Sequence, residues 1–101
     1  QAARNKLEAM DQILDELKLN RTQAAYLGDD LPDLAAIQSV ALSAAPSDAA
    51  EEVRRAVTWR LDAAGGQGVV REFVERFLRE RGDWDDLIAE FSGSSSELTR
   101  R

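Results

Sequence analysis

One feature constrains the fold of this chain more than any other: a short apolar run that ends in glycine and is followed by three acidic side chains. The run 24–27 (AAYL) leads directly into residues 28–33 (GDDLPD). A short continuous apolar segment is typical of a parallel strand covered on both faces, and open α/β sheets bind ligands at the carboxyl ends of their strands. The sequence therefore predicts a strand at 24–27 with a binding crevice where it meets the acidic loop.

Helical and strand patterns alternate along most of the chain. Apolar side chains recur every three or four residues over 4–18, which predicts a helix that stops near Asn20. The apolar runs 40–44 and 56–59 predict two further strands. A short helix is expected before the second strand, and a helix capped by Ser47 before the third. This alternation predicts an α/β fold of short parallel strands flanked by helices.

The last part of the chain predicts a glycine-rich loop and two helices. Residues 62–68 contain three glycines, which suits positive φ angles, and an amphipathic helix then runs to Gly82. A final helix carries apolar side chains on one face, and this face packs either on its own domain or against another subunit. We expect one domain over 1–91 and a mobile tail over 92–101. The apolar face of the final helix consists of Trp84, Leu87, Ile88 and Phe91.

Length and charge exclude several classes of protein. A chain of 101 residues forms one domain or part of one, and its net charge of −6 comes without a basic cluster. Nucleic-acid binding normally needs a positive surface, so no nucleic-acid partner is expected. No apolar stretch approaches the roughly 20 residues of a membrane span, and no signal-peptide pattern is present. We therefore expect no membrane association and a cytoplasmic location.

The chain contains neither cysteine nor histidine. This composition excludes disulfides, thiolate nucleophiles, imidazole-dependent triads and the usual zinc ligand sets. Any chemistry must then depend on carboxylates, lysine, arginine and hydroxyl groups. Carboxylates without imidazole favour a hard cation such as Mg²⁺.

The acidic loop has two interpretations. Asp30 as a helix N-cap and Asp33 three residues later imitate a capping box, and Pro32 is harmless in a first helical turn. Asp29 is not needed for such a cap, and neighbouring carboxylates repel one another unless a cation offsets their charge. A metal or phosphate site and a capped turn therefore both stay open, and Lys6 taken alone is typical of an ordinary solvated lysine.

Several motifs occur in an order that points to one family: Lys6-Leu7, residues 25–34 (AYLGDDLPDL), 41–43 (ALS), 47–49 (SDA) and 65–72 (GGQGVVRE). Over residues 3–82 the chain resembles the carboxyl-terminal part of the 3-deoxy-D-manno-octulosonate 8-phosphate phosphatase family, in the haloacid dehalogenase superfamily. The resemblance implies a Rossmann-like fold and a Mg²⁺-dependent hydrolase of a sugar-acid phosphate in lipopolysaccharide biosynthesis. It also implies a homo-oligomer, commonly a tetramer.

The resemblance assigns a role to each polar residue of the loop. Asp29 would ligate Mg²⁺, and Lys6 would be catalytic and substrate-binding, holding the phosphate and an aspartyl nucleophile. Asp30 and Asp33 would be supporting residues that orient metal waters or Lys6, and Asp33 would also be counted with Lys6 in the catalytic set. Phosphoryl transfer needs mainly positioning and charge neutralisation, which a divalent ion and a lysine supply without imidazole.

One element of the family is absent from the chain. The nucleophile motif, Asp-x-Asp at the end of an apolar strand, precedes the family's lysine, and only five residues precede Lys6 here. We therefore expect the sequence to be part of a longer protein and to be inactive alone. The alternatives are a non-catalytic oligomerisation module, as attached to some acylneuraminate cytidylyltransferases, and an α/β fragment whose capped acidic turn has no site.

Overall fold

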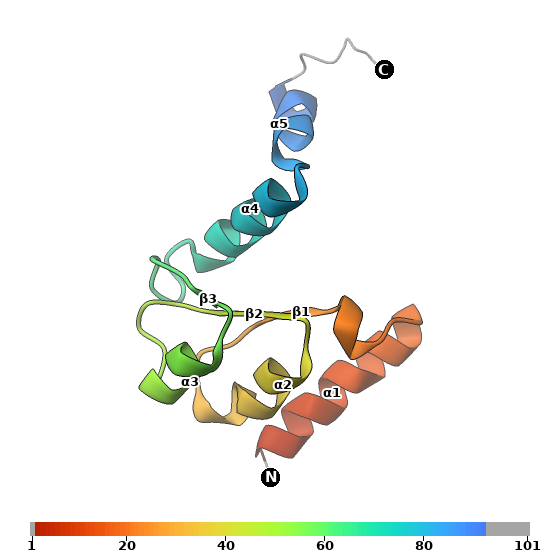
Figure 1. Cartoon of the computed structure of the whole chain (residues 1–101), viewed down its shortest axis with the longest axis vertical. Coiled ribbons are helices and arrows are strands. Elements are labelled where there is room, and N and C mark those ends of the chain that lie inside the picture. Colours follow the sequence, from red (N-terminus) through yellow and green to blue (C-terminus); the bar gives the residue numbers. More distant parts are fainter. Residues whose placement is uncertain (1, 93–101) are drawn as a thin grey trace. The chain divides into compact units, whose positions relative to one another are not determined.

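The computed structural model describes residues 2–92, and the chain divides into two compact units, residues 1–70 and 71–101 (Figure 1). The expected single domain over 1–91 stays a prediction. The expected tail lies outside the described residues except for Ser92, which is the last residue of a helix. Among the described helices, none is both long and apolar enough to cross a membrane.

The first unit contains a three-stranded parallel sheet with the order β1-β2-β3. Its strands are β1 (Ala25–Leu27), β2 (Leu42–Ala45) and β3 (Trp59–Arg60). Tyr26 pairs with Ser43 and Ala44 pairs with Trp59. Because the strands are parallel, their carboxyl ends meet at one edge of the sheet. The α/β fold with short parallel strands is confirmed.

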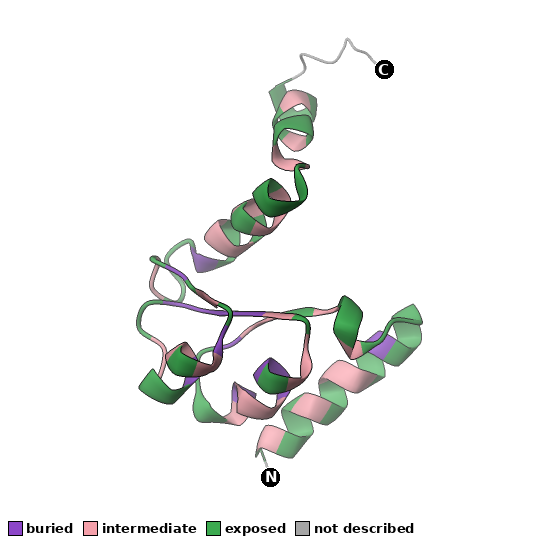
Figure 2. Cartoon of the chain, in the orientation of Figure 1, coloured by how far each residue is buried: buried purple, intermediate pink, exposed green. Residues whose placement is uncertain are grey.

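Three helices of this unit lie on one side of the sheet (Figure 1): α1 (Ala2–Leu17), α2 (Leu34–Ser39) and α3 (Glu51–Ala56). The core between helices and sheet includes Ile37, Ala45, Val53 and Val57. Figure 2 shows the buried segments along β2 and on α2. Val53 is fully buried, and burying such a side chain contributes about 1.5–3 kcal/mol. The alanines of β2 are also fully buried, and their small size lets the helices approach the sheet closely.

The first predicted helix is confirmed, but its end differs from the prediction. Helix α1 closes at Leu17, and Lys18 adopts a left-handed backbone with a φ of 60°. The Leu19 N–H then donates to the Leu14 carbonyl at 2.8 Å, as in a common helix C-cap. Asn20 instead caps the next element, the 3₁₀ helix η1 (Arg21–Gln23), by accepting a hydrogen bond from the Thr22 N–H.

The predicted boundaries around α3 are wrong. Ser47 lies in a turn, and α3 begins only at Glu51, after Ala50, with no side-chain cap. The apolar run 56–59 is not a strand throughout, because its first residue still belongs to α3 and the Val57 N–H donates to the Val53 carbonyl at 3.2 Å. The run therefore finishes a helix before it enters the sheet, and the third strand is short.

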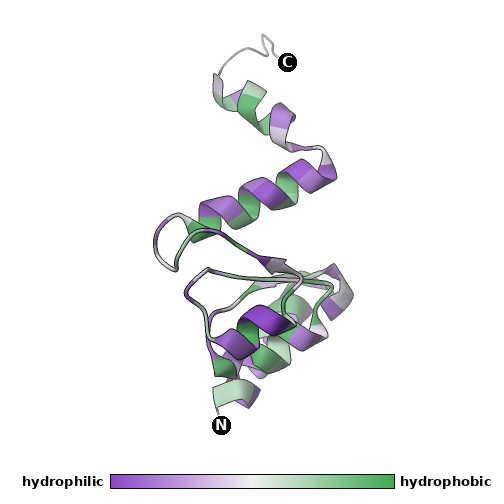
Figure 3. Ribbon diagram, turned by 60° about the vertical axis from the view of Figure 1, so that its left-hand side comes forward, coloured by the Kyte–Doolittle hydropathy of each residue, from purple (hydrophilic) through white to green (hydrophobic). Residues whose placement is uncertain are grey.

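The second unit consists of most of α4 (Val69–Arg81) and of α5 (Trp84–Ser92). Helix α4 has an apolar and a polar face (Figure 3). Glu75 pairs with Arg79, four residues later, at 2.9 Å. Gly82, with a φ of 83°, ends the helix as predicted. On α5, Phe91 is 83% exposed. Whether the apolar face of α5 packs on its own domain or against another subunit stays open.

Candidate functional site

The acidic loop meets a pocket at the carboxyl end of β1. This site pocket has a volume of about 310 Å³. It is lined by Lys6 from α1, by the end of β1 and the start of the acidic loop, and by two residues of the glycine loop. The pocket lies entirely within the first unit. The structure therefore brings together Lys6, Asp29 and Asp33, three of the four residues predicted for the site. The pocket lining includes Lys6, Tyr26, Asp29, Asp33, Gly65 and Gly66.

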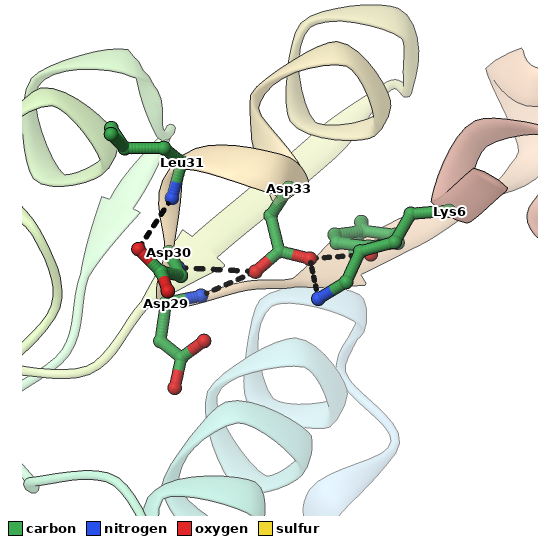
Figure 4. Close-up of polar contacts among 6 residues, drawn as sticks. Lys6, Asp29, Asp30, Leu31 and Asp33 are labelled. Carbon is green, nitrogen blue, oxygen red and sulfur yellow. Dashed lines mark hydrogen bonds and ion pairs between the residues drawn. The ribbon is translucent and has the colours of Figure 1, made fainter. Parts of the chain in front are cut away.

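Asp33 lies at the centre of the hydrogen-bond network (Figure 4). Its Oδ1 accepts hydrogen bonds from Lys6 Nζ at 2.9 Å and from the Tyr26 hydroxyl at 2.8 Å. Its Oδ2 accepts from the backbone N–H groups of Asp29 and Asp30, at 3.0 and 3.1 Å. A carboxylate has about four lone-pair positions, so these four donors use its accepting capacity. This compensation explains how a residue that is only 3% exposed keeps its charge.

Gly28 makes room for the Asp33 side chain. A Cβ atom at position 28 would lie 2.7 Å from the Asp33 Cβ and 2.9 Å from its Cγ. These separations are far below ordinary carbon contact distances of about 3.5–4 Å. Glycine at this position therefore permits the close approach that buries the carboxylate beneath its own loop.

The protonation equilibria follow from this network. Burial raises the pKa of the Asp33 carboxyl, but the hydrogen bonds from Lys6, Tyr26 and two amides together hold the pKa below its ordinary value. The hydrogen bond to Asp33 raises the pKa of Lys6. Burial, with the hydrogen bond to Asp33, raises the pKa of Tyr26 to about 12. At neutral pH the network therefore holds a carboxylate, an ammonium and a neutral phenol.

Asp30 has the capping role that the sequence offered it. Its Oδ1 accepts the Leu31 N–H at 2.8 Å at the start of the 3₁₀ helix η2 (Leu31–Asp33). Asp33 completes the capping box, and Pro32 lies in the first turn. The capped-turn interpretation is thus correct for two of the three acidic residues.

Asp29 differs from both neighbours. Its backbone is fixed on both sides, because its N–H donates to Asp33 and its carbonyl accepts the Ala50 N–H at 3.0 Å. Its side chain is exposed, points away from Asp33 in Figure 4, and makes no hydrogen bond or ion pair with the described residues. A fixed backbone with a free carboxylate is suitable for binding a cation.

One carboxylate is an incomplete metal site. Within residues 2–92, no group of three or more acidic, histidine or cysteine side chains is arranged to hold a metal ion. Mg²⁺ is commonly bound through one or two carboxylates together with substrate phosphates and water. The Asp29 oxygen atoms therefore fit Mg²⁺ as one contribution to a site that needs further ligands, and the predicted site roles stay predictions.

Lys6 has donors left for a ligand. Its ammonium group has three N–H donors, and its one hydrogen bond within the described part of the chain is to Asp33. The side chain is 45% exposed and lines the site pocket. Two N–H donors are thus available to an anion in that pocket. An ordinary solvated lysine differs, because no partner holds its ammonium group in one position.

The glycine loop forms another wall of the site pocket. The Gly65 N–H donates to the Asp48 Oδ1 at 2.8 Å, and the Ser47 N–H donates to the Ala63 carbonyl at 2.9 Å. Gly66 has a φ of 76°, as the glycine-rich pattern predicted. The sequence pattern gives no sign of the contact between Gly65 and Asp48, or of the bond between Tyr26 and Asp33. The one available signal for Tyr26 is that its hydroxyl is the single polar side-chain group in the apolar run 24–27.

Comparisons with known proteins agree on one family. The model of the haloacid dehalogenase-like hydrolase family matches residues 1–73. The 3-deoxy-D-manno-octulosonate 8-phosphate phosphatase KdsC of Salmonella typhi is 35% identical over 86 residues, which cover 85% of this chain and 46% of the relative. The enzyme of the same name from Escherichia coli K12 matches to the same extent. The chain thus spans about half the length of the curated relatives it matches.

Solved structures show the same similarity. A probable YrbI-family phosphatase from Pseudomonas syringae is 42% identical, with a TM-score of 0.80 over 85% of this chain and 49% of that one. The 3-deoxy-D-manno-octulosonate 8-phosphate phosphatase of Moraxella catarrhalis, solved with magnesium, phosphate and KDO, is 32% identical. Its TM-score is 0.81 over 90% of this chain and 51% of that one. A cobalt-bound phosphatase from Haemophilus influenzae is also 32% identical, with a TM-score of 0.73 over 76% of this chain and 45% of that one.

Proposed function

This chain belongs to the haloacid dehalogenase-like hydrolase family, and from that premise we propose that it is the carboxyl-terminal part of a Mg²⁺-dependent phosphatase. The substrate is a phosphorylated sugar acid of the 3-deoxy-D-manno-octulosonate 8-phosphate type, on which several relatives act by name. The observation that carries the proposal is the arrangement at the site pocket. A free carboxylate, Asp29, and an ammonium group with spare donors, Lys6, line the same pocket from different elements.

Each residue has a distinct part in the proposed reaction. Asp29 would hold Mg²⁺, and the bound ion would neutralise negative charge on the phosphate oxygens. Lys6 would place its two spare N–H donors on the phosphate group and on the attacking aspartate. Asp33 would act through Lys6, because its own oxygen atoms are already occupied by four donors. Asp30 would keep the loop capped.

The aspartate nucleophile would come from a part of the protein not included in this sequence. The matches support this, because they cover only about half of each relative, and the other half of the relative has no counterpart in this sequence. The sheet supports it as well, because β1 is an end strand among the described residues and its outer edge is free to pair. Beside it lies an apolar groove of about 490 Å³, formed by α1 and the segment leading into β1. A further strand from the missing part would cover both features.

A completed chimera tests the proposal. The 101-residue chain would be joined to the residues of the Moraxella catarrhalis phosphatase that precede its matched region, which we expect to supply the Asp-x-Asp motif. We expect Mg²⁺-dependent release of phosphate from 3-deoxy-D-manno-octulosonate 8-phosphate by the chimera and none by the chain alone. Turnover by the chain alone would contradict the missing-nucleophile account. A folded chimera without turnover would instead favour a non-catalytic module.

A further inference from the structure

The Tyr26 hydroxyl and the Lys6 ammonium donate to the same oxygen atom. Both reach Asp33 Oδ1, at 2.8 Å and 2.9 Å, although one residue lies on β1 and the other on α1. The side chains also differ in stiffness. A tyrosine ring on a strand has two side-chain torsions, whereas lysine carries its charge on a flexible four-carbon stem. The shared oxygen is therefore located by the stiff partner, and the flexible partner follows it.

The other half of the carboxylate does not make Tyr26 redundant. Oδ2 is held by two amides of the acidic loop, Asp29 N–H and Asp30 N–H, which anchor one end of the group. The carboxylate is planar, so with that anchor alone its remaining freedom is rotation about the Cβ–Cγ bond, to the extent that two amide hydrogen bonds of 3.0 and 3.1 Å allow. Such a rotation moves Oδ1 and Lys6 with it. The bond from Tyr26 supplies a second anchor from a different element, the sheet. Two anchors from separate elements define one position for the oxygen atom to which Lys6 binds.

We propose that Tyr26 is a positioning residue, which fixes the Lys6 ammonium beside the site pocket by holding Asp33 Oδ1 in place. The meaning of this role for catalysis rests on the proposed function, but the geometry can be tested without turnover. Tyr26, on β1, and Lys6, on α1, both line the site pocket. Tyr26 acts on any bound phosphate through Asp33 and Lys6.

The sequence makes the test specific. Lys6 and Lys18 are the two lysines of the chain, and Tyr26 is its one tyrosine. In the isotopically labelled 101-residue chain, NMR can detect the scalar coupling across the hydrogen bond from Lys6 Nζ to the Asp33 carboxylate carbon. We expect this coupling in the original chain. In Tyr26→Phe we expect it to fall below detection, with faster motion of the Lys6 ammonium and an unchanged Lys18 signal.

A matched control separates positioning from general destabilisation. Val53→Ala removes buried methyl groups from the core without touching the network, so it should lower stability while the coupling persists. A coupling that persists in Tyr26→Phe would overturn the proposal, and so would its absence from the original chain. Loss of the coupling in Val53→Ala as well would overturn it too, because the effect would then follow stability. A chimera without turnover rejects the proposed function and leaves this coupling pattern unaffected.

Discussion

The acidic loop has an aspartate at its buried end and another at its exposed end, and the two have opposite surroundings. At the buried end, Asp33 is 3% exposed and accepts four hydrogen bonds. At the exposed end, Asp29 is exposed and its carboxylate has no hydrogen-bond partner among the described residues. The two are linked, because Asp33 binds the Asp29 N–H and so fixes the backbone that directs the free carboxylate outward. The buried carboxylate shapes the loop, and the exposed one is left for a ligand.

The largest effect expected from this comparison is on stability. Asp33→Asn replaces one of the two accepting oxygen atoms by an NH2 group, which can only donate, and so leaves buried donors without a partner. We expect a loss of about 3 kcal/mol in the free energy of unfolding, measured by urea denaturation. The matched change Asp29→Asn should alter it by less than about 0.5 kcal/mol. Equal losses at the two positions would show that the ends of the loop do not differ.

The close approach at Gly28 gives the next effect. Gly28→Ala places a methyl group 2.7 Å from the Asp33 Cβ, so the carboxylate must shift away from its donors. We expect a destabilisation of about 2 kcal/mol by the same measurement. Gly65→Ala is the control, since its new Cβ would lie 3.5 Å from Asp48, an ordinary contact. A Gly28→Ala variant as stable as the control would mean that Asp33 does not need this space.

A third prediction concerns alkaline pH. The pKa of Tyr26 is raised to about 12 in the folded chain, and the unfolded chain should titrate near the ordinary value of about 10. A raised pKa means that folding favours the neutral phenol. Its contribution to stability is therefore complete below about pH 10 and is lost as the pH rises toward 12.

Ultraviolet absorbance of the single tyrosine measures this pKa directly, because no other phenol is present. The same titration in concentrated urea is the control. A native chain that titrates near 10, as in urea, would show that the hydroxyl is not held by burial and by Asp33.

Some parts of this arrangement could be predicted from the sequence because they depend on residues that are close together along the chain. The cap at Asp30 and the glycine that ends α4 involve neighbouring residues, and both were predicted correctly. The run 56–59 was misread because a short apolar run suits either a buried strand or the last turn of a buried helix. The network of Lys6, Tyr26 and Asp33 joins two separate elements to the loop, so neither period nor spacing could predict it.

The most direct test of the account compares neighbouring carboxylates in the completed chimera. Asp29→Asn and Asp30→Asn make the same chemical change at adjacent exposed positions, but only the first removes the free carboxylate. The measurement is Mg²⁺-dependent kcat/KM for 3-deoxy-D-manno-octulosonate 8-phosphate. We predict a loss of at least about 100-fold for Asp29→Asn and of less than about 10-fold for Asp30→Asn. Full activity in Asp29→Asn, or equal losses in both variants, would contradict the assignment of Asp29 to the metal.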